Sequence, residues 1–459
     1  MRIAPRRGWP GRFAGRAANL ARMEVYRADT HRASGLYPFL HGASLPPIGA
    51  YIGHNTLTSQ AFSAHPSAWV KEGLVTNPNV MITGIPGSGK SAHIKALCFR
   101  LMVFGQRTLI AGDVKGEYAE LCRHLGTEPV RLGPGLPGRL NPLDAGPLGH
   151  NLDKINGEEL AARLTEIRRR RLTLIRSLLE LQLRRTLQPH EGEALRAAVR
   201  QVTGELAGTS PTRLQTPTLP MVYRVLQDPT PEMAHELRVR GEDIQLAREQ
   251  MASLRSALGE MIDGHLGGLF DQQTSIELDW DAPIQSVDIS ALQEYGDETV
   301  AMVLTCVSSW AQSAIDQPGR PWIVVRDELW RQLQSGGAAM VRKIDSDLRL
   351  SRASGTIQVL ATHRLSDLEA VPDAATLARE LIASCETRIQ LAQDTRPLRM
   401  TREAIGLTSA ECDLIGSWGA AQRGRALWKV GRGGGSHAVQ LILSSVEERL
   451  FETDEKMIV

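Results

Sequence analysis

Residues 84–91 constrain the fold more than any other part of the chain. They read Gly-Ile-Pro-Gly-Ser-Gly-Lys-Ser, which matches the pattern G-x-x-x-x-G-K-S. The apolar run 80–83 precedes them and the helix-forming run 92–104 follows, so the sequence predicts a strand, a glycine-rich loop and a helix in that order. Backbone N–H groups of such a loop can surround a phosphate chain, and the helix N-terminus adds partial positive charge. The pattern therefore predicts a nucleotide site.

The expected ligands are ATP and Mg²⁺, which different parts of this loop would bind. The Lys90 ammonium would reach the β- and γ-phosphates, and the Ser91 hydroxyl would bind Mg²⁺. A chance glycine-rich turn is the alternative, and the strand and helix patterns on either side argue against it. The residues that we expect to contact the nucleotide here are Gly84, Ile85, Pro86, Gly87, Ser88, Gly89, Lys90, Ser91 and Ala92.

The charge of the chain says little about its partners, because 53 Lys and Arg residues face 51 Asp and Glu residues. Its distribution is more informative. The first 32 residues contain eight arginines and only two acidic residues, Glu24 and Asp29. Such a basic segment could contact anionic lipid or nucleic acid, and a solvated tail fits the pattern equally well.

Cysteine spacing and hydropathy indicate a cytoplasmic protein. The five cysteines of the 459 residues are far apart and form no C-x-x-C pair, which favours reduced thiols and no metal site built from Cys or His. No apolar stretch approaches the length of a membrane-spanning helix, and the N-terminus lacks the apolar core of a signal peptide. Any membrane contact would then be peripheral, at the inner face of the cell membrane.

Strand patterns alternate with helix patterns, which is typical of an α/β fold with a mainly parallel sheet covered on both faces. We expect a basic, partly flexible segment at 1–78, the first part of the core at 79–150, and the rest of the core at 263–459. Residues 151–262 have a helical apolar pattern and should form an all-helical insertion. The strands that we expect are 80–83, 108–111, 129–132, 283–289, 322–325, 356–361, 388–392, 426–430 and 439–443.

Two acidic residues could complete a hydrolytic site. Asp327 and Glu328 follow the apolar strand 322–325 directly, and ligands of parallel sheets lie beyond the carboxyl ends of strands. Asp327 would hold Mg²⁺, directly or through water, and Glu328 would polarise the attacking water. A solvated turn is the alternative. The phosphate-binding loop upstream favours the catalytic interpretation.

Three further residues are candidates for contacts with the nucleotide. Asp113 follows the second strand and would lie near the phosphates if that strand neighbours the first. Helix-capping is the equally compatible alternative. Thr362 and His363 end the strand after the Asp-Glu strand, where a polar side chain could sense the γ-phosphate, although a structural histidine would also fit there.

An arginine from a neighbouring subunit often completes sites of this kind. Arg352 is our leading candidate for this role. A surface ion pair is the alternative for Arg352 and for the other arginines around this part of the sheet, which are Arg349, Arg364 and Arg388.

Six motifs occur in a fixed order: G-I-P-G-S-G-K-S at 84–91, D-V-K-G-E-Y at 113–118, R-L-N-P-L-D at 139–144, H-L-G-G-L-F-D at 265–271, R-D-E-L-W at 326–330 and A-T-H-R-L-S-D-L at 361–368. Together they resemble the motifs of the TraC-like ATPases of conjugative transfer and type IV secretion, within the FtsK/HerA superfamily. The resemblance covers about residues 75–459. Thr362-His363 stands where many relatives have Thr-Gln, and 349–352 reads Arg-Leu-Ser-Arg where relatives have an arginine pair. The long N-terminal domain of many members has no counterpart here.

The resemblance implies a RecA-like core with a helical insertion, assembly into a homo-hexamer, and ATP hydrolysis that powers secretion or DNA transfer together with other machine proteins. By motif match, Lys90 and Ser91 belong to the nucleotide site, and Asp327 and Glu328 form its acidic pair. Two alternatives remain open: a DNA-translocating motor or coupling protein of the same superfamily, and a nucleotide-switched scaffold with little turnover.

Overall fold

The structure, a computed structural model, forms one unit over residues 44–459. It describes Arg12 and residues 45–452, so the basic segment 1–32 lies outside the described residues except for Arg12. The gaps within 45–452 are residues 134, 150–151, 206–215, 232, 234–236, 238–243, 265, 277, 316–320, 366–374, 419–421 and 432–434.

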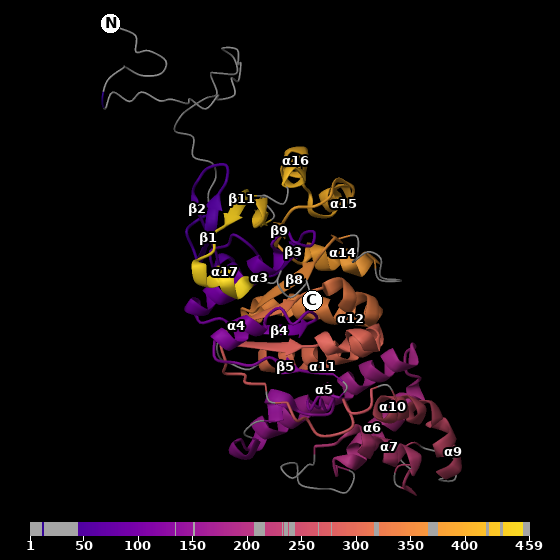
Figure 1. The fold of residues 1–459 in the computed structure, drawn as a ribbon. Coiled ribbons are helices and arrows are strands. Elements are labelled where there is room, and N and C mark those ends of the chain that lie inside the picture. The colour runs from indigo at the N-terminus through magenta and orange to yellow at the C-terminus, as the bar shows by residue number, and fades with distance from the viewer. Residues whose placement is uncertain are drawn as a thin grey trace. The chain divides into compact units, whose positions relative to one another are not determined.

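One eleven-stranded sheet organises this unit, in the order β2-β1-β11-β10-β9-β3-β8-β7-β4-β6-β5 (Figure 1). All nine strands predicted from the sequence are present. Residues before the first predicted strand add β1 and β2, which pair with each other and, through β1, with β11. The strands are β1 Ala50–Asn55, β2 Ala61–Ala64, β3 Val80–Thr83, β4 Arg107–Asp113, β5 Val130–Arg131, β6 Ile284–Asp288, β7 Trp322–Arg326, β8 Ile357–Thr362, β9 Thr387–Gln390, β10 Arg425–Val430 and β11 Gly435–Leu441.

The sheet is parallel from β9 to β5 and antiparallel from β2 to β10 and at the β10–β9 pair. Every residue of β3, β7 and β8 is buried, as expected for parallel strands with helices on both faces. The mainly parallel sheet predicted from the sequence is confirmed.

Successive residues of a strand point to opposite faces of the sheet, so their side chains lie in two separate hydrophobic cores. In β3, Val80 and Ile82 pack with α2, α3, α4 and α17, whereas Met81 packs with α11, α12 and α14. The first core lies under α2 Pro66–Lys71, α3 Lys90–Leu101, α4 Ala119–His124 and α17 Ser445–Phe451. The second lies under α11 Asp297–Ile315, α12 Leu329–Ser354, α14 Ala375–Ala383, α15 Thr395–Ile405 and α16 Ser409–Ser417.

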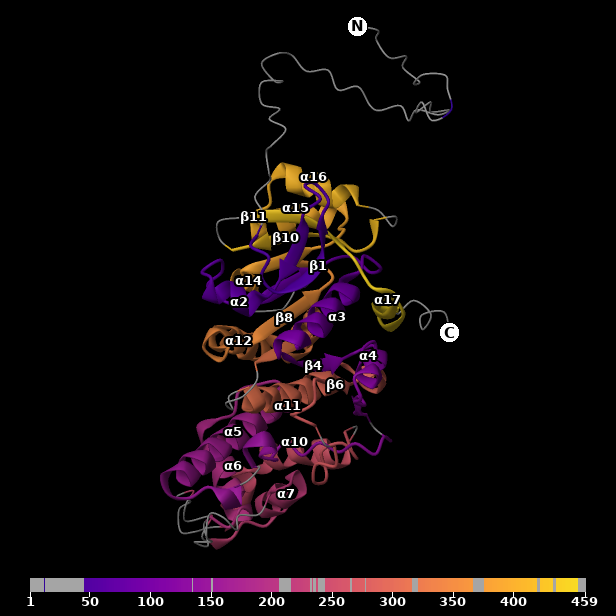
Figure 2. The same ribbon diagram turned by 90° about the vertical axis from the view of Figure 1, so that its left-hand side faces the viewer.

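A helical region is inserted between β5 and β6, as predicted. Its described residues from 152 to 264 contain helices and no strand. Its long helix α5 packs on α11, and Figures 1 and 2 both place α5 to α10 on the far side of α11 from β1 and β11. The α-helices of the region are α5 Gly157–Leu183, α6 Pro189–Val202, α7 Leu219–Gln227, α9 Ile244–Gln250 and α10 Ala252–Asp263.

Two observations bear on the compartment expected from the sequence. All five cysteines are free thiols and four of them are buried. Burial raises the pKa of Cys98 and of Cys385 to about 12, so these thiols are protonated at neutral pH. Across the described part of the chain, we find no helix whose length and apolar character would let it cross a bilayer.

Candidate nucleotide site

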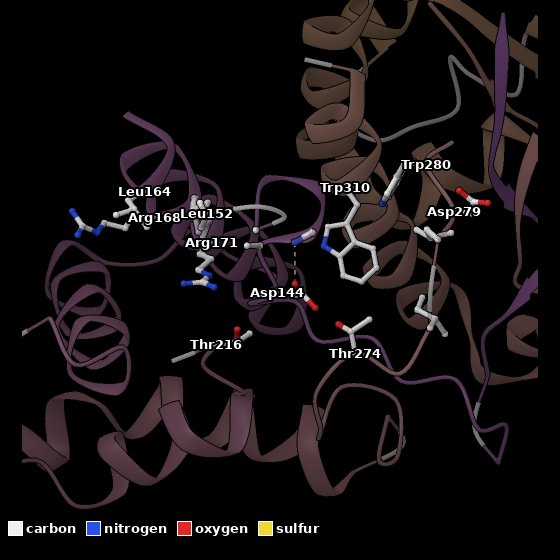
Figure 3. A pocket seen from close by; sticks show the side chains of 16 residues that line it. Asp144, Leu152, Leu164, Arg168, Arg171, Thr216, Thr274, Asp279, Trp280 and Trp310 are labelled. Carbon is white, nitrogen blue, oxygen red and sulfur yellow. Dashed lines mark hydrogen bonds between the residues drawn. The ribbon is translucent and has the colours of Figure 1, made fainter. Parts of the chain in front are cut away.

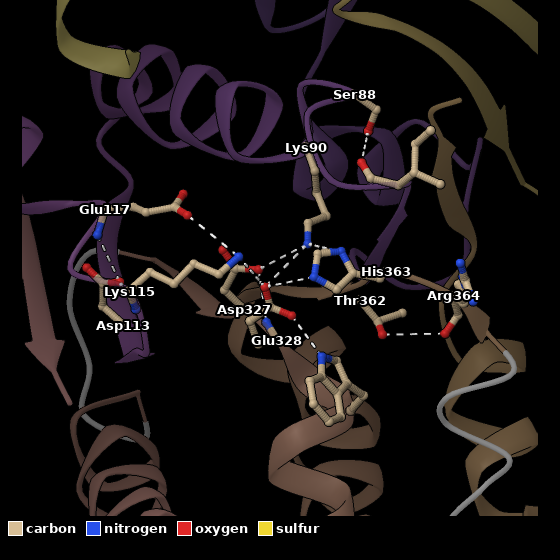
Figure 4. A network of polar contacts seen from close by, with 12 residues as sticks. Ser88, Lys90, Asp113, Lys115, Glu117, Asp327, Glu328, Thr362, His363 and Arg364 are labelled. Carbon is tan, nitrogen blue, oxygen red and sulfur yellow. Dashed lines mark hydrogen bonds and ion pairs between the residues drawn. The ribbon is translucent and has the colours of Figure 1, made fainter. Parts of the chain in front are cut away.

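The strand order brings four loops together at one edge of the sheet. β3, β8, β7 and β4 are adjacent and parallel, so the segments after their carboxyl ends share this edge. These segments carry Lys90 after β3, His363 after β8, Glu328 after β7 and Lys115 after β4, and Figure 4 shows their side chains converging. Sheet topology thus assembles a polar site from segments that are far apart in the sequence.

The glycine-rich loop turns back from β3 into α3 through backbone that only glycine adopts easily. Gly87 has φ 75° and Gly89 has φ 101°. A Cβ at Gly84 would lie 2.6 Å from the Ser88 hydroxyl oxygen and would clash with it. The Ser88 hydroxyl donates to the Ile85 carbonyl over 2.7 Å, which closes the turn.

Several N–H groups of this loop are available to a ligand. Those of Gly87 and Gly89 donate no hydrogen bond within the described part of the chain. The helix α3 begins at Lys90, so the first-turn N–H groups of Lys90, Ser91 and Ala92 lack the helical acceptor that later residues have. The loop therefore has the donors that a phosphate chain requires.

Lys90 is buried and faces the acidic pair across the sheet edge. Its Nζ lies 3.8 Å from Asp327 Oδ1 and 3.9 Å from Glu328 Oε1. It also lies 3.3 Å from His363 Nδ1. Because an ammonium group only donates, His363 Nδ1 must accept here, and the ring proton resides on Nε2.

Glu328 is the centre of the polar network. Its Oε1 lies 2.7 Å from Lys115 Nζ and 3.1 Å from His363 Nε2. Its Oε2 accepts from the Trp330 indole N–H over 2.8 Å. Burial alone would raise the pKa of this carboxyl, but the hydrogen bond from His363 and the charges of Lys90 and Lys115 outweigh burial and lower it. Glu328 is therefore a buried carboxylate that stays ionised.

The backbone of Glu328 is left-handed, with φ 49° and ψ 44°. Few residues other than glycine adopt this conformation, which costs on the order of 1 kcal/mol. It lets the chain turn sharply from β7 into α12, so that the carboxylates of Asp327 and Glu328 both face the loop of Lys90.

Asp327 is held by its neighbours at both oxygens. Oδ1 accepts from the Glu328 backbone N–H over 2.9 Å, and Oδ2 accepts from the Tyr118 hydroxyl over 3.1 Å. Burial, together with the charge of Asp327, raises the pKa of Tyr118 well above its usual value, so its hydroxyl keeps the proton that it donates.

Asp113 has a well-defined role in the backbone. The condition for its nearness to the phosphates is not met, because β7 and β8 lie between β4 and β3. Its Oδ1 accepts from the N–H groups of Lys115 and Glu117, and its Oδ2 accepts from that of Tyr118. Burial and the nearby Asp288 and Asp327 raise the pKa of Asp113 to about 6, despite those hydrogen bonds.

Of the other predicted residues, Thr362 lies at the carboxyl ends of the parallel strands, whereas Arg352 lies far from them. Thr362 lies at the site, paired with Thr83 of β3, and its hydroxyl contacts the carbonyl of Arg364 over 3.5 Å. Arg352 is exposed in the last turn of α12, on the order of 35 Å along the helix from Glu328 at 1.5 Å per residue. Arg352 therefore cannot reach the site of its own chain.

The alternative arginines have local partners. Arg349 pairs with Asp345 over 2.7 Å, and Arg364 contacts Asp394 over 3.5 Å. Arg388 donates to the carbonyls of Cys385 and Ile405.

Sequence reasoning missed four residues at the site. Three of them, Lys115, Tyr118 and Trp330, lie inside the motifs D-V-K-G-E-Y and R-D-E-L-W. In these motifs they stand close to carboxylates already predicted for the site, and that proximity could have identified them. Arg423 comes from the segment before β10, and its Nη2 lies 3.6 Å from where a Cβ of Gly87 would be. No local pattern links Arg423 to the glycine-rich loop.

The structure also contains a cavity of about 720 Å³ at the boundary of the insertion and the core. Figure 3 shows it between α5, which contributes Arg171, and α11, which contributes Trp310. None of the predicted site residues lines it. The cavity is therefore separate from the polar sheet edge that carries Lys90, Asp327 and Glu328.

Comparison with known proteins identifies the fold. No protein-family model and no curated protein sequence matches the chain. Among solved structures, VirB4 of Thermoanaerobacter pseudethanolicus matches with a TM-score of 0.67 and 21% identity, over 88% of this chain and 100% of that one. The bacterial conjugative coupling protein TrwB, without its first 70 residues, matches with a TM-score of 0.50 and 14% identity, over 86% and 89%. The TrwB complex with ADP and Mg²⁺ also matches with a TM-score of 0.50 and 14% identity, over 80% and 86%. The chain has a RecA-like P-loop fold with a helical insertion, the fold of VirB4 and TrwB.

Proposed function

We propose that this chain is a Mg²⁺-dependent ATPase that powers a conjugative transfer or type IV secretion apparatus. One observation carries the proposal. Lys90, Asp327, Glu328 and His363 converge beside a glycine-rich loop in which the N–H groups of Gly87 and Gly89 donate no hydrogen bond to any described residue. A cation, two ionised or ionisable carboxylates and free backbone donors are the parts that phosphoryl transfer to water requires.

Each residue has a distinct task in this proposal. The loop N–H groups and Lys90 hold the phosphates, and Ser91 and Asp327 hold Mg²⁺, which supplies charge stabilisation at the γ-phosphate when bound. Glu328, kept ionised by its cationic neighbours, orients the attacking water and polarises it. His363 takes the place of a polar γ-phosphate sensor, with Thr362 beside it. Asp113 supports the site through the loop of Lys115 and Tyr118.

The likeness to VirB4 and TrwB supports the cellular role. TrwB is a conjugative coupling protein, and one of its solved structures contains ADP and Mg²⁺. The motifs that resemble TraC-like ATPases point the same way. We therefore propose a homo-hexamer in the cytoplasm, at the inner face of the cell membrane, working with other proteins of the machine. DNA is a possible substrate of the apparatus.

The decisive experiment is ATP hydrolysis by the purified chain with Mg²⁺, with and without DNA, alongside its mass by light scattering. We expect Mg²⁺-dependent turnover that Lys90→Ala abolishes. DNA stimulation that weakens steeply with salt would favour a DNA-translocating motor or coupling protein instead. Tight ATP binding with negligible turnover in every condition would favour a nucleotide-switched scaffold, and full activity of Lys90→Ala would refute the assignment of the loop.

A further inference from the structure

The contact between Lys115 and Glu328 has no place in the scheme above. Lys115 Nζ lies 2.7 Å from Glu328 Oε1, which makes it the shortest ion pair that Glu328 forms. Partial burial lowers the pKa of Lys115, but the contact with Glu328 more than offsets burial and raises it. Lys115 is therefore a permanent cation inside the proposed site.

The backbone that carries Lys115 is firmly anchored. Asp113 accepts from the N–H groups of Lys115 and Glu117, and Gly116 adopts φ 69° so that the chain can turn there. The Gln293 side chain also donates to the carbonyl of Val114. In contrast, the Lys115 side chain is 46% exposed. A fixed backbone with a long, half-exposed side chain allows the ammonium group to change partners while the loop stays in place.

The surroundings of Glu328 show why such a change matters. Its Oε1 is in contact with Lys115 and His363, and its Oε2 with Trp330 (Figure 4). Because a carboxylate oxygen has two lone pairs, Oε1 is fully occupied by protein donors, whereas Oε2 has one acceptor site left. For Oε1 to orient a water, Glu328 must lose Lys115 or His363 from that oxygen.

A second relationship identifies what would draw Lys115 away. Lys90 Nζ and Lys115 Nζ both lie within 4 Å of the same oxygen, Glu328 Oε1. The two ammonium groups are therefore neighbours with a carboxylate between them. A γ-phosphate that binds Lys90 arrives next to Lys115 and carries more negative charge than the carboxylate does.

We propose that Lys115 transfers from Glu328 to the γ-phosphate of bound ATP and thereby frees Oε1 of Glu328 for the attacking water. This inference rests on the proposed function and adds to it a residue that distinguishes ATP from ADP. No bond is made or broken in the transfer. ADP, which lacks the γ-phosphate, leaves Lys115 on Glu328 and the base occupied. Another anion near Lys115 is Glu117, at 3.8 Å, a weaker competitor than a phosphate.

The test compares equilibrium binding of a non-hydrolysable ATP analogue and of ADP, each with Mg²⁺. For Lys115→Met we expect at least a ten-fold loss of affinity for the ATP analogue, with ADP affinity changed by less than about two-fold. Lys115→Gln repeats the test should the Met variant fold poorly, and Lys115→Arg should restore part of the preference for the ATP analogue. Lys154→Met, on an exposed lysine outside the site, is the matched control.

A second background separates phosphate contact from mere positioning of Glu328. If Lys115 acts only through Glu328, Lys115→Met in a Glu328→Gln chain leaves the ratio of ATP-analogue to ADP affinity unchanged, and the proposal is wrong. If Lys115 contacts the γ-phosphate, the ratio falls in that background as well. A wild-type chain that binds neither nucleotide would refute the proposed function itself. If the wild-type chain binds and hydrolyses ATP, and the Lys115→Met variant has the same ratio of ATP-analogue to ADP affinity as the wild type, only this inference is refuted.

Discussion

The imidazole of His363 lies 3.1 Å from the Glu328 carboxylate through Nε2, while its Nδ1 faces Lys90 at 3.3 Å. One ring thus joins the proposed phosphate-binding lysine to the proposed water-activating carboxylate. This arrangement needs a group that accepts on one side and donates on the other. A glutamine amide has the same two capacities, so it can take the place of the imidazole here.

We expect His363→Gln to retain most of the ATPase rate and His363→Ala to lose it by a factor on the order of 10². The alanine side chain leaves Glu328 and Lys90 without the group that lies between them, whereas the amide replaces both contacts. Steady-state hydrolysis with thermal unfolding of each variant checks this. Equal activity of the Ala variant and the wild type would show that the ring is only structural.

Glu328→Gln should bind ATP with affinity close to that of the wild type but hydrolyse it slower by about 10²–10³-fold. The amide keeps the volume and one acceptor for the Trp330 indole, but it lacks the charge that polarises water. Single-turnover hydrolysis and nucleotide affinity, measured on one preparation, separate the two effects. Wild-type turnover in this variant would rule Glu328 out as the water-activating group.

Asp113 should make stability fall as pH rises from about 4 to 6. The fold raises its pKa to about 6, so the folded chain binds more protons than the unfolded chain in this window. The stabilisation from protonated Asp113 is complete below the unfolded pKa and is lost as pH passes the folded pKa, with a total of about 2–3 kcal/mol.

Urea unfolding between pH 4 and 7 checks this prediction for the wild type and Asp113→Asn. The neutral Asn side chain should remove the contribution, so the difference in unfolding free energy should shift in favour of the variant as pH rises. A difference that stays constant over the window would show that Asp113 titrates normally. Glu328 has the opposite sign, because its pKa is lowered and its stabilisation is lost only in more acidic solution.

Much of this site follows from the sequence, because its main parts sit in short motifs directly after buried strands. Lys90 and the pair Asp327-Glu328 come directly after apolar runs, and a parallel sheet brings such positions to one edge. The order of the strands in the sheet cannot be predicted from the sequence in the same way. Nothing local to β4 shows that β7 and β8 separate it from β3, so the sequence could not decide whether the condition attached to Asp113 is met.

Local sequence patterns also could not predict the contacts that the site residues make with one another. Lys115 and Tyr118 contact Glu328 and Asp327 only because β4 lies next to β7. The two N-terminal strands were missed for a related reason. β1 and β2 are short and partly exposed; they pair with each other, and β1 also pairs with β11, which lies about 380 residues later in the chain.

The strand that carries the acidic pair is tied to α12 by a buried ion pair. Arg326 Nη2 lies 2.7 Å from Asp347 Oδ2, and both side chains are at most 2% exposed. Asp347→Ala should lower the unfolding free energy by about 3–5 kcal/mol, because it leaves the Arg326 charge buried without its partner. Arg349→Ala, which breaks an exposed pair on the same helix, should lower the unfolding free energy far less.

Chemical denaturation of these two variants and of Arg326→Met/Asp347→Leu provides the comparison. The double substitution should recover most of the stability lost by Asp347→Ala, since no charge then remains buried. Equal losses for Asp347→Ala and Arg349→Ala would mean that burial does not set the cost of breaking the pair.

Arg352 lies at the far end of α12 from Glu328, so any role in hydrolysis requires a second copy of the chain. We expect Arg352→Ala to bind ATP normally and to lose most of its turnover, by about 10³-fold or more. Lys90→Ala should be inactive for a different reason, loss of phosphate binding.

Mixing the two inactive variants in equal amounts should then restore activity, because Lys90 of one chain can meet Arg352 of the other. In a randomly mixed ring, about a quarter of the interfaces would have both residues intact. Hydrolysis measured before and after the subunits are allowed to exchange checks this, with Arg349→Ala in place of Arg352→Ala as the control. If the mixture remains inactive although light scattering shows mixed assemblies, Arg352 does not act between subunits.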